Sequence, residues 1–161
     1  MNDDGVPVFD ACGPLPGVET VVLEASAGTG KTWTIASLAV RYVAELDVHL
    51  PELMLVTFGR AATTELRDRV RSRLVEVERA LRDPATARSS SDEVGALLAD
   101  VPPDEADRRR ARVARAVAEF DAATITTTHG FCQQMLAMLG TTADMDHDAV
   151  LVPDVADLEA D

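Results

Sequence analysis

An α/β fold with parallel strands is predicted by three features of this 161-residue sequence. Short apolar or β-branched segments alternate with longer segments in which apolar residues recur every three or four positions, as in amphipathic helices. Residues 53–58 form a continuous apolar segment of strand length, which is typical of a parallel strand buried on both faces. Polar motifs follow directly after the expected strands, where open parallel sheets bind their ligands. We therefore expect parallel strands joined by crossover helices, with function at their carboxyl ends.

The first half of the chain is expected to contain two strand–helix pairs. A first strand is predicted at about residues 20–25, and the helix after it should pack on a sheet by one face. That face is formed by Ile35, Leu38, Tyr42 and Leu46. The strand at 53–58 precedes a second helix, which ends before Pro84. Its buried stripe is predicted to be Leu66, Val70, Leu74, Val77 and Leu81.

The second half is less regular. Residues 83–104 resemble a polar insertion with one short helix around 94–98, and a helix starting near Arg108 should turn Val113, Val117 and Phe120 inward. A β-favouring segment at 122–128 then leads into a helix with Phe131, Met135 and either Met138 or Leu139 on one side. The expected organisation is an irregular lead-in at 1–19, one domain at 20–140 and an acidic tail at 141–161 that begins a further segment.

Composition narrows the class of protein. No apolar run approaches the roughly 18 residues of a membrane span, and the first residues lack the pattern of a signal peptide, so a cytoplasmic location is expected. Cys12 and Cys132 have no metal-ligand spacing and are expected to be free thiols. The net charge of −13 opposes general attraction to nucleic acid. Only residues 58–82 are positive, with seven arginines against four carboxylates, and a solvated helix face would explain them equally well.

A phosphate-binding loop is predicted between the first strand and its helix. It consists of Ala25, Ser26, Ala27, Gly28, Thr29, Gly30, Lys31 and Thr32. Glycines at 28 and 30 allow a tight turn whose N–H groups, with the positive end of the next helix, face an anion. Lys31 can reach the β- and γ-phosphates and the Thr32 hydroxyl can ligate Mg²⁺, so these two are the candidate catalytic residues of an ATP or GTP site.

Two details bear on this interpretation. Ala25 stands where the general phosphate-loop pattern has a leading glycine, so a simple glycine-bearing turn is the competing interpretation. However, Lys31 is the only lysine in a chain with fourteen arginines. A compact ammonium at this position cannot be replaced by the larger guanidinium fork, which favours the phosphate-loop interpretation.

Three motifs together resemble superfamily-one helicases of the UvrD-like group. Ala25–Thr32 is similar to their ATP-binding motif, in which alanine commonly replaces the first glycine. Residues 57–70 resemble their second motif, with Gly59, Arg60 and Ala61 departing from its usual residues, and Thr128-His129-Gly130-Phe131-Cys132 resembles their Thr-x-His-Gly-Phe-Cys segment. The resemblance covers about residues 9–139 and is strongest to the branch that combines helicase and exonuclease activities.

The resemblance implies a P-loop NTPase fold of the RecA-like type, here an incomplete first motor domain, with ATP and Mg²⁺ as cofactors. It also implies single-stranded and double-stranded DNA, and two further subunits of a helicase–exonuclease complex, as partners. The implied DNA-binding residues are Thr57, Phe58, Arg60, Thr128 and His129. Phe58 can stack on a base, and the others can contact phosphates without reading sequence. Considered alone, His129 would more simply be a helix-capping or core histidine.

One part of the implied machinery is missing from this sequence. ATP hydrolysis also requires a carboxylate pair on a later strand, and no apolar strand ending in Asp-Glu follows residue 139. We therefore expect the isolated chain to bind nucleotide and hydrolyse essentially none. Two other functions remain open at this point: a P-loop kinase acting on a small metabolite, and a non-catalytic nucleotide-binding module. The kinase would leave the second and third motifs unexplained.

Overall fold

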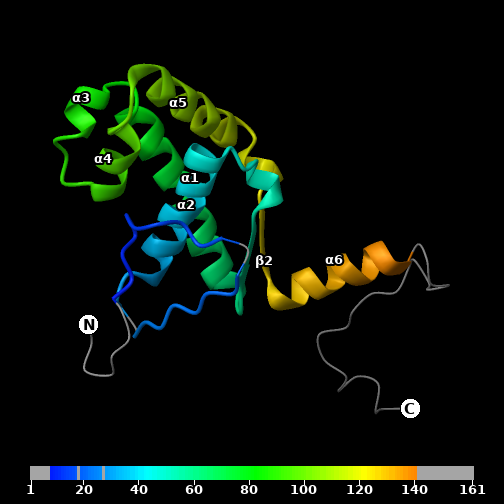
Figure 1. Ribbon diagram of the computed structural model, residues 1–161. Helices are drawn as coiled ribbons and strands as arrows, with labels where there is room; N and C mark the ends of the chain where they lie inside the picture. Colours follow the sequence, from blue (N-terminus) through cyan, green and yellow to red (C-terminus); the bar gives the residue numbers. More distant parts are fainter. Residues whose placement is uncertain (1–7, 18, 27, 141–161) are drawn as a thin grey trace, which may run out of the picture.

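The computed structural model describes residues 8–17, 19–26 and 28–140. Within them, α1 (Lys31–Leu46) is followed by a 3-10 turn η1 (Leu50–Glu52), β1 (Met54–Thr57) and α2 (Arg60–Ala80). Next come α3 (Pro84–Ala87), α4 (Glu93–Ala99), α5 (Pro103–Ala118), η2 (Phe120–Ala122), β2 (Thr124–Thr127) and α6 (Thr128–Gly140). Figure 1 shows α1 to α5 gathered together, whereas α6 extends away from them beyond β2. The expected tail at 141–161 and the start of the lead-in lie outside the described residues.

The sheet in the described part of the chain consists of β1 and β2, which run parallel as predicted. The register pairs Met54 with Thr124 and Thr57 with Thr127, so both strands end at the same edge. The prediction that β1 is buried on both faces was wrong, because Met54 and Val56 are 45% and 43% exposed. With a single neighbouring strand and helices on only part of its surface, this sheet leaves one apolar face of β1 uncovered.

The predicted first strand is also absent: residues 20–25 form no strand in the structure. A strand requires a neighbour to hydrogen-bond with its backbone N–H and C=O groups. Among the described residues this segment has no ladder partner, and its apolar side chains lie in solvent, with Val22 84% exposed. The apolar composition of the segment was therefore not sufficient to place it in the sheet.

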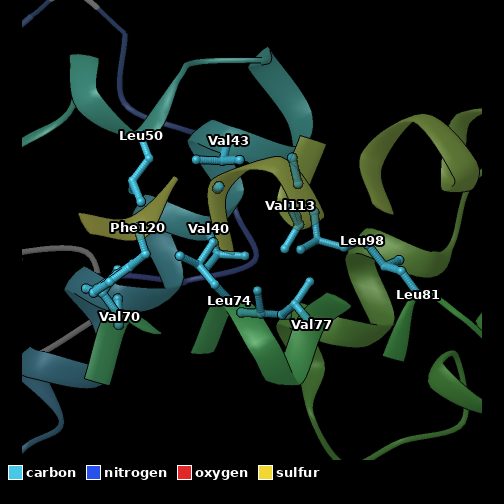
Figure 2. Close-up of a cluster of buried hydrophobic side chains, with 14 of the residues drawn as sticks. Val40, Val43, Leu50, Val70, Leu74, Val77, Leu81, Leu98, Val113 and Phe120 are labelled. Carbon is cyan, nitrogen blue, oxygen red and sulfur yellow. The ribbon is translucent and has the colours of Figure 1, made fainter. Parts of the chain in front are cut away.

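The core is formed mainly by helices rather than by helices on a sheet. α1 packs against α2 and α5, and α2 packs against α5, while α4 closes one end. Figure 2 shows the side chains that meet there. Those labelled are Val40, Val43, Leu50, Val70, Leu74, Val77, Leu81, Leu98, Val113 and Phe120. The predicted stripe of α2 is confirmed, because all five of its residues are buried.

The predicted face of α1 was wrong at two of its four residues, whereas Leu38 and Tyr42 are half-buried. Ile35 and Leu46 are 40% and 58% exposed, and the fully buried residues include Ala36, Val40 and Ala44 instead. Small side chains at spacing four let neighbouring helices approach closely, so α1 presents its alanines and valines to α2 and α5. The spacing of apolar residues predicted the helix correctly. It did not predict the buried side, because the larger apolar residues lie on a neighbouring face.

Residues 83–104 contribute to this core. The short helix expected around 94–98 is present as α4, and its Val94 and Leu98 are completely buried. The preceding turn, α3, is capped by Asp83, whose carboxylate accepts hydrogen bonds from the Thr86 backbone N–H and hydroxyl. Those hydrogen bonds lower the pKa of Asp83, as expected for a carboxylate that caps a helix.

An ion pair between α2 and the start of α4 holds the two helices together. Arg73 is buried, with its side chain 5% exposed, and donates to the two Asp92 carboxylate oxygens at 2.7 and 2.6 Å. Burial alone would raise the pKa of Asp92, but the hydrogen bonds and charge of Arg73 outweigh it and hold that pKa below its usual range. The pair is therefore a bidentate, charge-assisted contact.

Substituting Asp92→Asn should destabilise the fold, because the buried Arg73 guanidinium would keep only its longer contact with Glu76, at 3.4 Å. We expect the free energy of unfolding to fall by about 2 kcal/mol, below the loss for a fully buried pair. In the parent chain the Arg73–Asp92 pair makes its full contribution to the free energy of unfolding above the unfolded-state pKa of Asp, about 3.9. That contribution is lost as pH falls through the lower folded-state pKa of Asp92. The variant should therefore lose less stability below about pH 4.

Urea unfolding followed by circular dichroism at several pH values measures both effects. Asp121→Asn is the matched control, because the Asp121 side chain is 98% exposed and lies 3.9 Å from Arg67. It should change stability little. Equal losses in the two variants would refute a specific role for the Arg73–Asp92 pair.

Candidate nucleotide and single-strand sites

The predicted phosphate loop leads directly into α1. The helix begins at Lys31, and Gly30 is its N-cap residue with φ 86° and ψ 16°. Gly28 also has a positive φ, 77°. Both glycines therefore occupy the left-handed region that side-chain-bearing residues rarely adopt, which explains glycine at these positions. Ala27, also predicted to belong to the loop, lies outside the described residues.

Lys31 lies across this loop. Its Nζ atom donates to the backbone oxygens of Ala25 and Ser26, at 2.9 and 2.6 Å, and the Thr29 hydroxyl donates to the Ser26 oxygen at 2.7 Å. The ammonium group of Lys31, the first residue of α1, therefore lies against the backbone of Ala25 and Ser26. Thr32 is the second residue of α1 and is partly exposed.

The donor set of the loop fits a polyphosphate. α1 begins without a capping side chain and without an acidic residue in its first turn, so its N-terminal N–H groups are not neutralised by the chain itself. A mobile ammonium beside these N–H groups provides the charge that a phosphate requires, and a hydroxyl in the first turn provides an oxygen ligand for Mg²⁺.

The second and third motifs, far apart in sequence, meet at the carboxyl ends of β1 and β2. The register places Thr57 beside Thr127, and the Thr128 hydroxyl donates to the Thr57 backbone oxygen at 3.3 Å. Phe58 is 95% exposed, and Arg60 and His129 are exposed as well. All five residues predicted for DNA binding therefore lie at or next to the carboxyl ends of β1 and β2.

Two further threonines at this edge were missed by the sequence interpretation. Thr63, in the first turn of α2, has its hydroxyl oxygen 2.7 Å from that of Thr57. Thr127 accepts a hydrogen bond from the Gly130 backbone N–H at 3.1 Å. Thr63 lies within the second motif and Thr127 directly precedes the third, so the signal was available: a hydroxyl next to a strand end commonly bonds the nearby backbone.

A cleft near the phosphate loop was not predicted either. Its volume is about 450 Å³, and it is lined by Trp33, Arg73, Glu76, Ser91, Asp92 and Glu93. The Arg73 guanidinium lies 5.6 Å from the centre of the Trp33 ring, so this ring, two residues after Lys31, rests on the ion pair that joins α2 to α4. The residues that line the cleft thus come from the start of α1, from α2 and from the start of α4 with the residues just before it.

The arginines of the positive segment 58–82 and those of the basic run 108–110 make different kinds of contact. Arg67 and Arg71 lie over the Phe120 ring, at 5.2 and 5.4 Å from its centre. The basic run 108–110 pairs with Asp104, Glu105 and Glu78, which supports its interpretation as a solvated helix face. Arg60, the first residue of α2, is exposed and follows Phe58 by two positions in the sequence.

Comparison with known proteins places the chain in a family. Residues 14–159 match the UvrD/REP helicase N-terminal domain, so the chain belongs to this family of helicases. It is similar to proteins named RecBCD enzyme subunit RecB. It is 49% identical over 152 residues to that of Mycolicibacterium smegmatis, 46% over 164 residues to that of Mycobacterium tuberculosis, and 35% over 149 residues to that of Escherichia coli.

The coverage of these similarities is uneven. They include 94%, 93% and 88% of this chain, respectively, but 14%, 14% and 12% of the relatives. The chain thus corresponds to a small part of each relative's length. The three-motif resemblance to UvrD-like helicases is confirmed. The described residues contain no helix long and apolar enough to cross a membrane.

Gly130→Ala should strain the junction between β2 and α6. A Cβ atom at residue 130 would clash with the Thr126 hydroxyl oxygen. We expect a loss of about 1–3 kcal/mol in the free energy of unfolding, as for other overpacked sites. Adding Thr126→Ala should recover most of that loss. Gly17→Ala is the control, because a Cβ there meets nothing within 4 Å. Urea unfolding tests this, and equal effects of the two glycine substitutions would contradict it.

Proposed function

We propose that the chain forms part of the first motor domain of an ATP-dependent DNA helicase, with the RecA-like P-loop NTPase fold. The observation that carries the proposal is the parallel register of β1 and β2, which brings the Phe58 and His129 segments together. Family membership and the phosphate loop at the start of α1 support it. The similarity to helicases over most of the chain does not favour a metabolite kinase or a non-catalytic module.

In this proposal the loop binds ATP with Mg²⁺. The backbone N–H groups at the start of α1 hold the phosphates, Lys31 leaves the Ala25 and Ser26 oxygens to contact them, and Thr32 ligates the metal ion. Bound Mg·ATP would supply the chemical energy of the motor. The role of this chain is to bind and orient the polyphosphate.

The carboxyl ends of β1 and β2 would bind single-stranded DNA. Phe58 offers an exposed ring on which any base can stack. Arg60, His129 and Thr128 surround the phosphates of the same strand, and Thr57 lines the site from β1. Base stacking and phosphate contacts do not depend on the identity of the base, which suits a motor that moves along any sequence.

The names of the relatives extend the proposal to the whole protein. We propose a RecB-like helicase and exonuclease subunit that works with RecC-like and RecD-like subunits on double-stranded DNA ends in repair and recombination. A cytoplasmic location would follow. The chain alone should bind ATP without turning it over, because this sequence contains no apolar segment ending in Asp-Glu after residue 139.

Lys31→Ala should weaken ATP binding, because it removes the ammonium that lies on the loop. Titration of a fluorescent ATP analogue with Mg²⁺ should show at least a tenfold loss of affinity, which corresponds to about 1.4 kcal/mol. Arg88→Gln, which removes one exposed positive charge elsewhere, should leave the affinity unchanged. Equal binding by the parent chain and the Lys31 variant would refute the nucleotide site.

Phe58→Ala should weaken binding of a short oligothymidylate. Stacking of a base on an aromatic ring contributes about 1–3 kcal/mol, so the affinity should fall by roughly fivefold to a hundredfold. Fluorescence anisotropy of the labelled oligonucleotide measures this. Phe58→Leu keeps an apolar side chain without a π-face and should bind as weakly as Phe58→Ala, whereas Phe58→Trp should retain affinity. Full binding by the Leu variant would exclude stacking.

A further inference from the structure

Two threonine hydroxyls enclose the backbone oxygen that follows Phe58. The Thr63 hydroxyl lies 3.0 Å from the Gly59 oxygen, and the Thr57 hydroxyl lies 3.2 Å from the same atom. The two hydroxyl oxygens are 2.7 Å apart, the usual separation for one hydroxyl donating to another. The Thr63 backbone N–H also donates to the Gly59 oxygen, at 2.9 Å.

The number of hydrogens restricts how these bonds can form. Each hydroxyl has one hydrogen, and the 2.7 Å contact between the oxygens requires one of the two to lie between them. The other hydroxyl then donates to the Gly59 oxygen. If Thr63 donates to that oxygen, Thr57 donates to Thr63, and the reverse holds in the second arrangement. In both, the Thr57 hydrogen is used inside the chain and is not free for a phosphate.

The Thr57 and Thr63 hydroxyls contact the backbone of Gly59, the residue directly after Phe58. Gly59 is the N-cap of α2, in an extended conformation with φ −131° and ψ 154°, and no side chain caps the helix. The backbone around Gly59 has a wide conformational range of its own, because glycine carries no Cβ. One of the two hydroxyls and the Thr63 backbone N–H donate to its oxygen together and hold the peptide in one orientation, and Phe58, immediately before it, remains 95% exposed.

We infer that Thr63, together with Thr57, is a positioning residue for the single-strand site, whose paired hydroxyls fix the Gly59 carbonyl and thereby hold the Phe58 ring outward for stacking. Nothing in the motif resemblance assigns a role to Thr63. The inference rests on the proposed function, because it assumes that Phe58 binds a base. It changes the role of Thr57 from a phosphate donor to a support for the ring.

The neighbouring Thr64 provides a matched control. Its hydroxyl also lies near the backbone oxygen four residues earlier, 3.2 Å from that of Arg60. The hydroxyl that pairs with Thr57, however, is that of Thr63. Thr63→Val and Thr64→Val therefore remove the same group from adjacent positions of the same helix. Thr63→Ser retains the hydroxyl, and Thr63→Ala provides a second removal should the Val variant unfold.

The test measures the affinity of the chain for oligothymidylate by anisotropy, with each threonine variant made in the parent chain and in Phe58→Ala. Thr63→Val and Thr63→Ala should bind about three- to tenfold more weakly than the parent, as expected for the loss of one internal hydrogen bond. Thr63→Ser should restore binding, and Thr64→Val should not change it. In the Phe58→Ala chain, Thr63→Val should have no further effect, because the ring that it positions is gone.

Two results would overturn the inference alone. One is parent-like binding by both Thr63→Val and Thr63→Ala, and the other is an equal loss from Thr63→Val with and without Phe58. In either case Phe58→Ala would still weaken binding, so the proposed function would stand. If Phe58→Ala itself binds like the parent, the proposed stacking site fails, and the role of Thr63 fails with it.

Discussion

The close packing of α1 against α2 is the constraint on which both candidate sites depend. Each candidate segment lies immediately before one of these helices: the predicted phosphate loop before α1, and Phe58 before α2. Ala36, Val40 and Ala44 let α1 approach its neighbours closely, and the buried Leu74 and Val70 of α2 fill the space between them. The directions of the two helix N-termini are thus set by the core. A loop that binds a ligand needs such a rigid support.

Arginines connect the rest of the chain to this pair of helices. Arg41 of α1 donates to the backbone oxygens of Ala11 and Gly13, both at 2.7 Å, and so ties the lead-in to the core. On α5, Arg112 donates to the Ala44 oxygen and Arg115 to Asp47, at 2.8 and 2.7 Å. Such contacts use the several donors of a guanidinium group at once. They explain why arginine serves the framework while the single lysine lies in the phosphate loop.

Local sequence patterns predicted elements well where one face of a helix is wide and apolar, as in α2, whose five-residue stripe is entirely buried. They also located β1, β2, α4 and the residues that meet at the sheet edge. They failed where burial depends on a neighbour that the pattern does not contain. Residues 20–25 have the composition of a strand but no ladder partner among the described residues, and α1 buries alanines rather than Ile35. The burial of Arg73 was not predicted, because its partner, Asp92, lies 19 residues away in the sequence.

The distribution of carboxylates explains how a chain with a net charge of −13 can offer sites for anions. Acidic residues accompany the starts of the structural helices: Asp83 caps α3, Glu93 lies in the first turn of α4, and Asp104 and Glu105 lie in that of α5. α1 and α2 have glycine N-caps and no acidic residue in the first turn. A carboxylate at these two positions would neutralise the helix dipole and compete with a phosphate for the same N–H groups. Because these effects act within about one helical turn, the local pattern of charge rather than the net charge determines where an anion can bind.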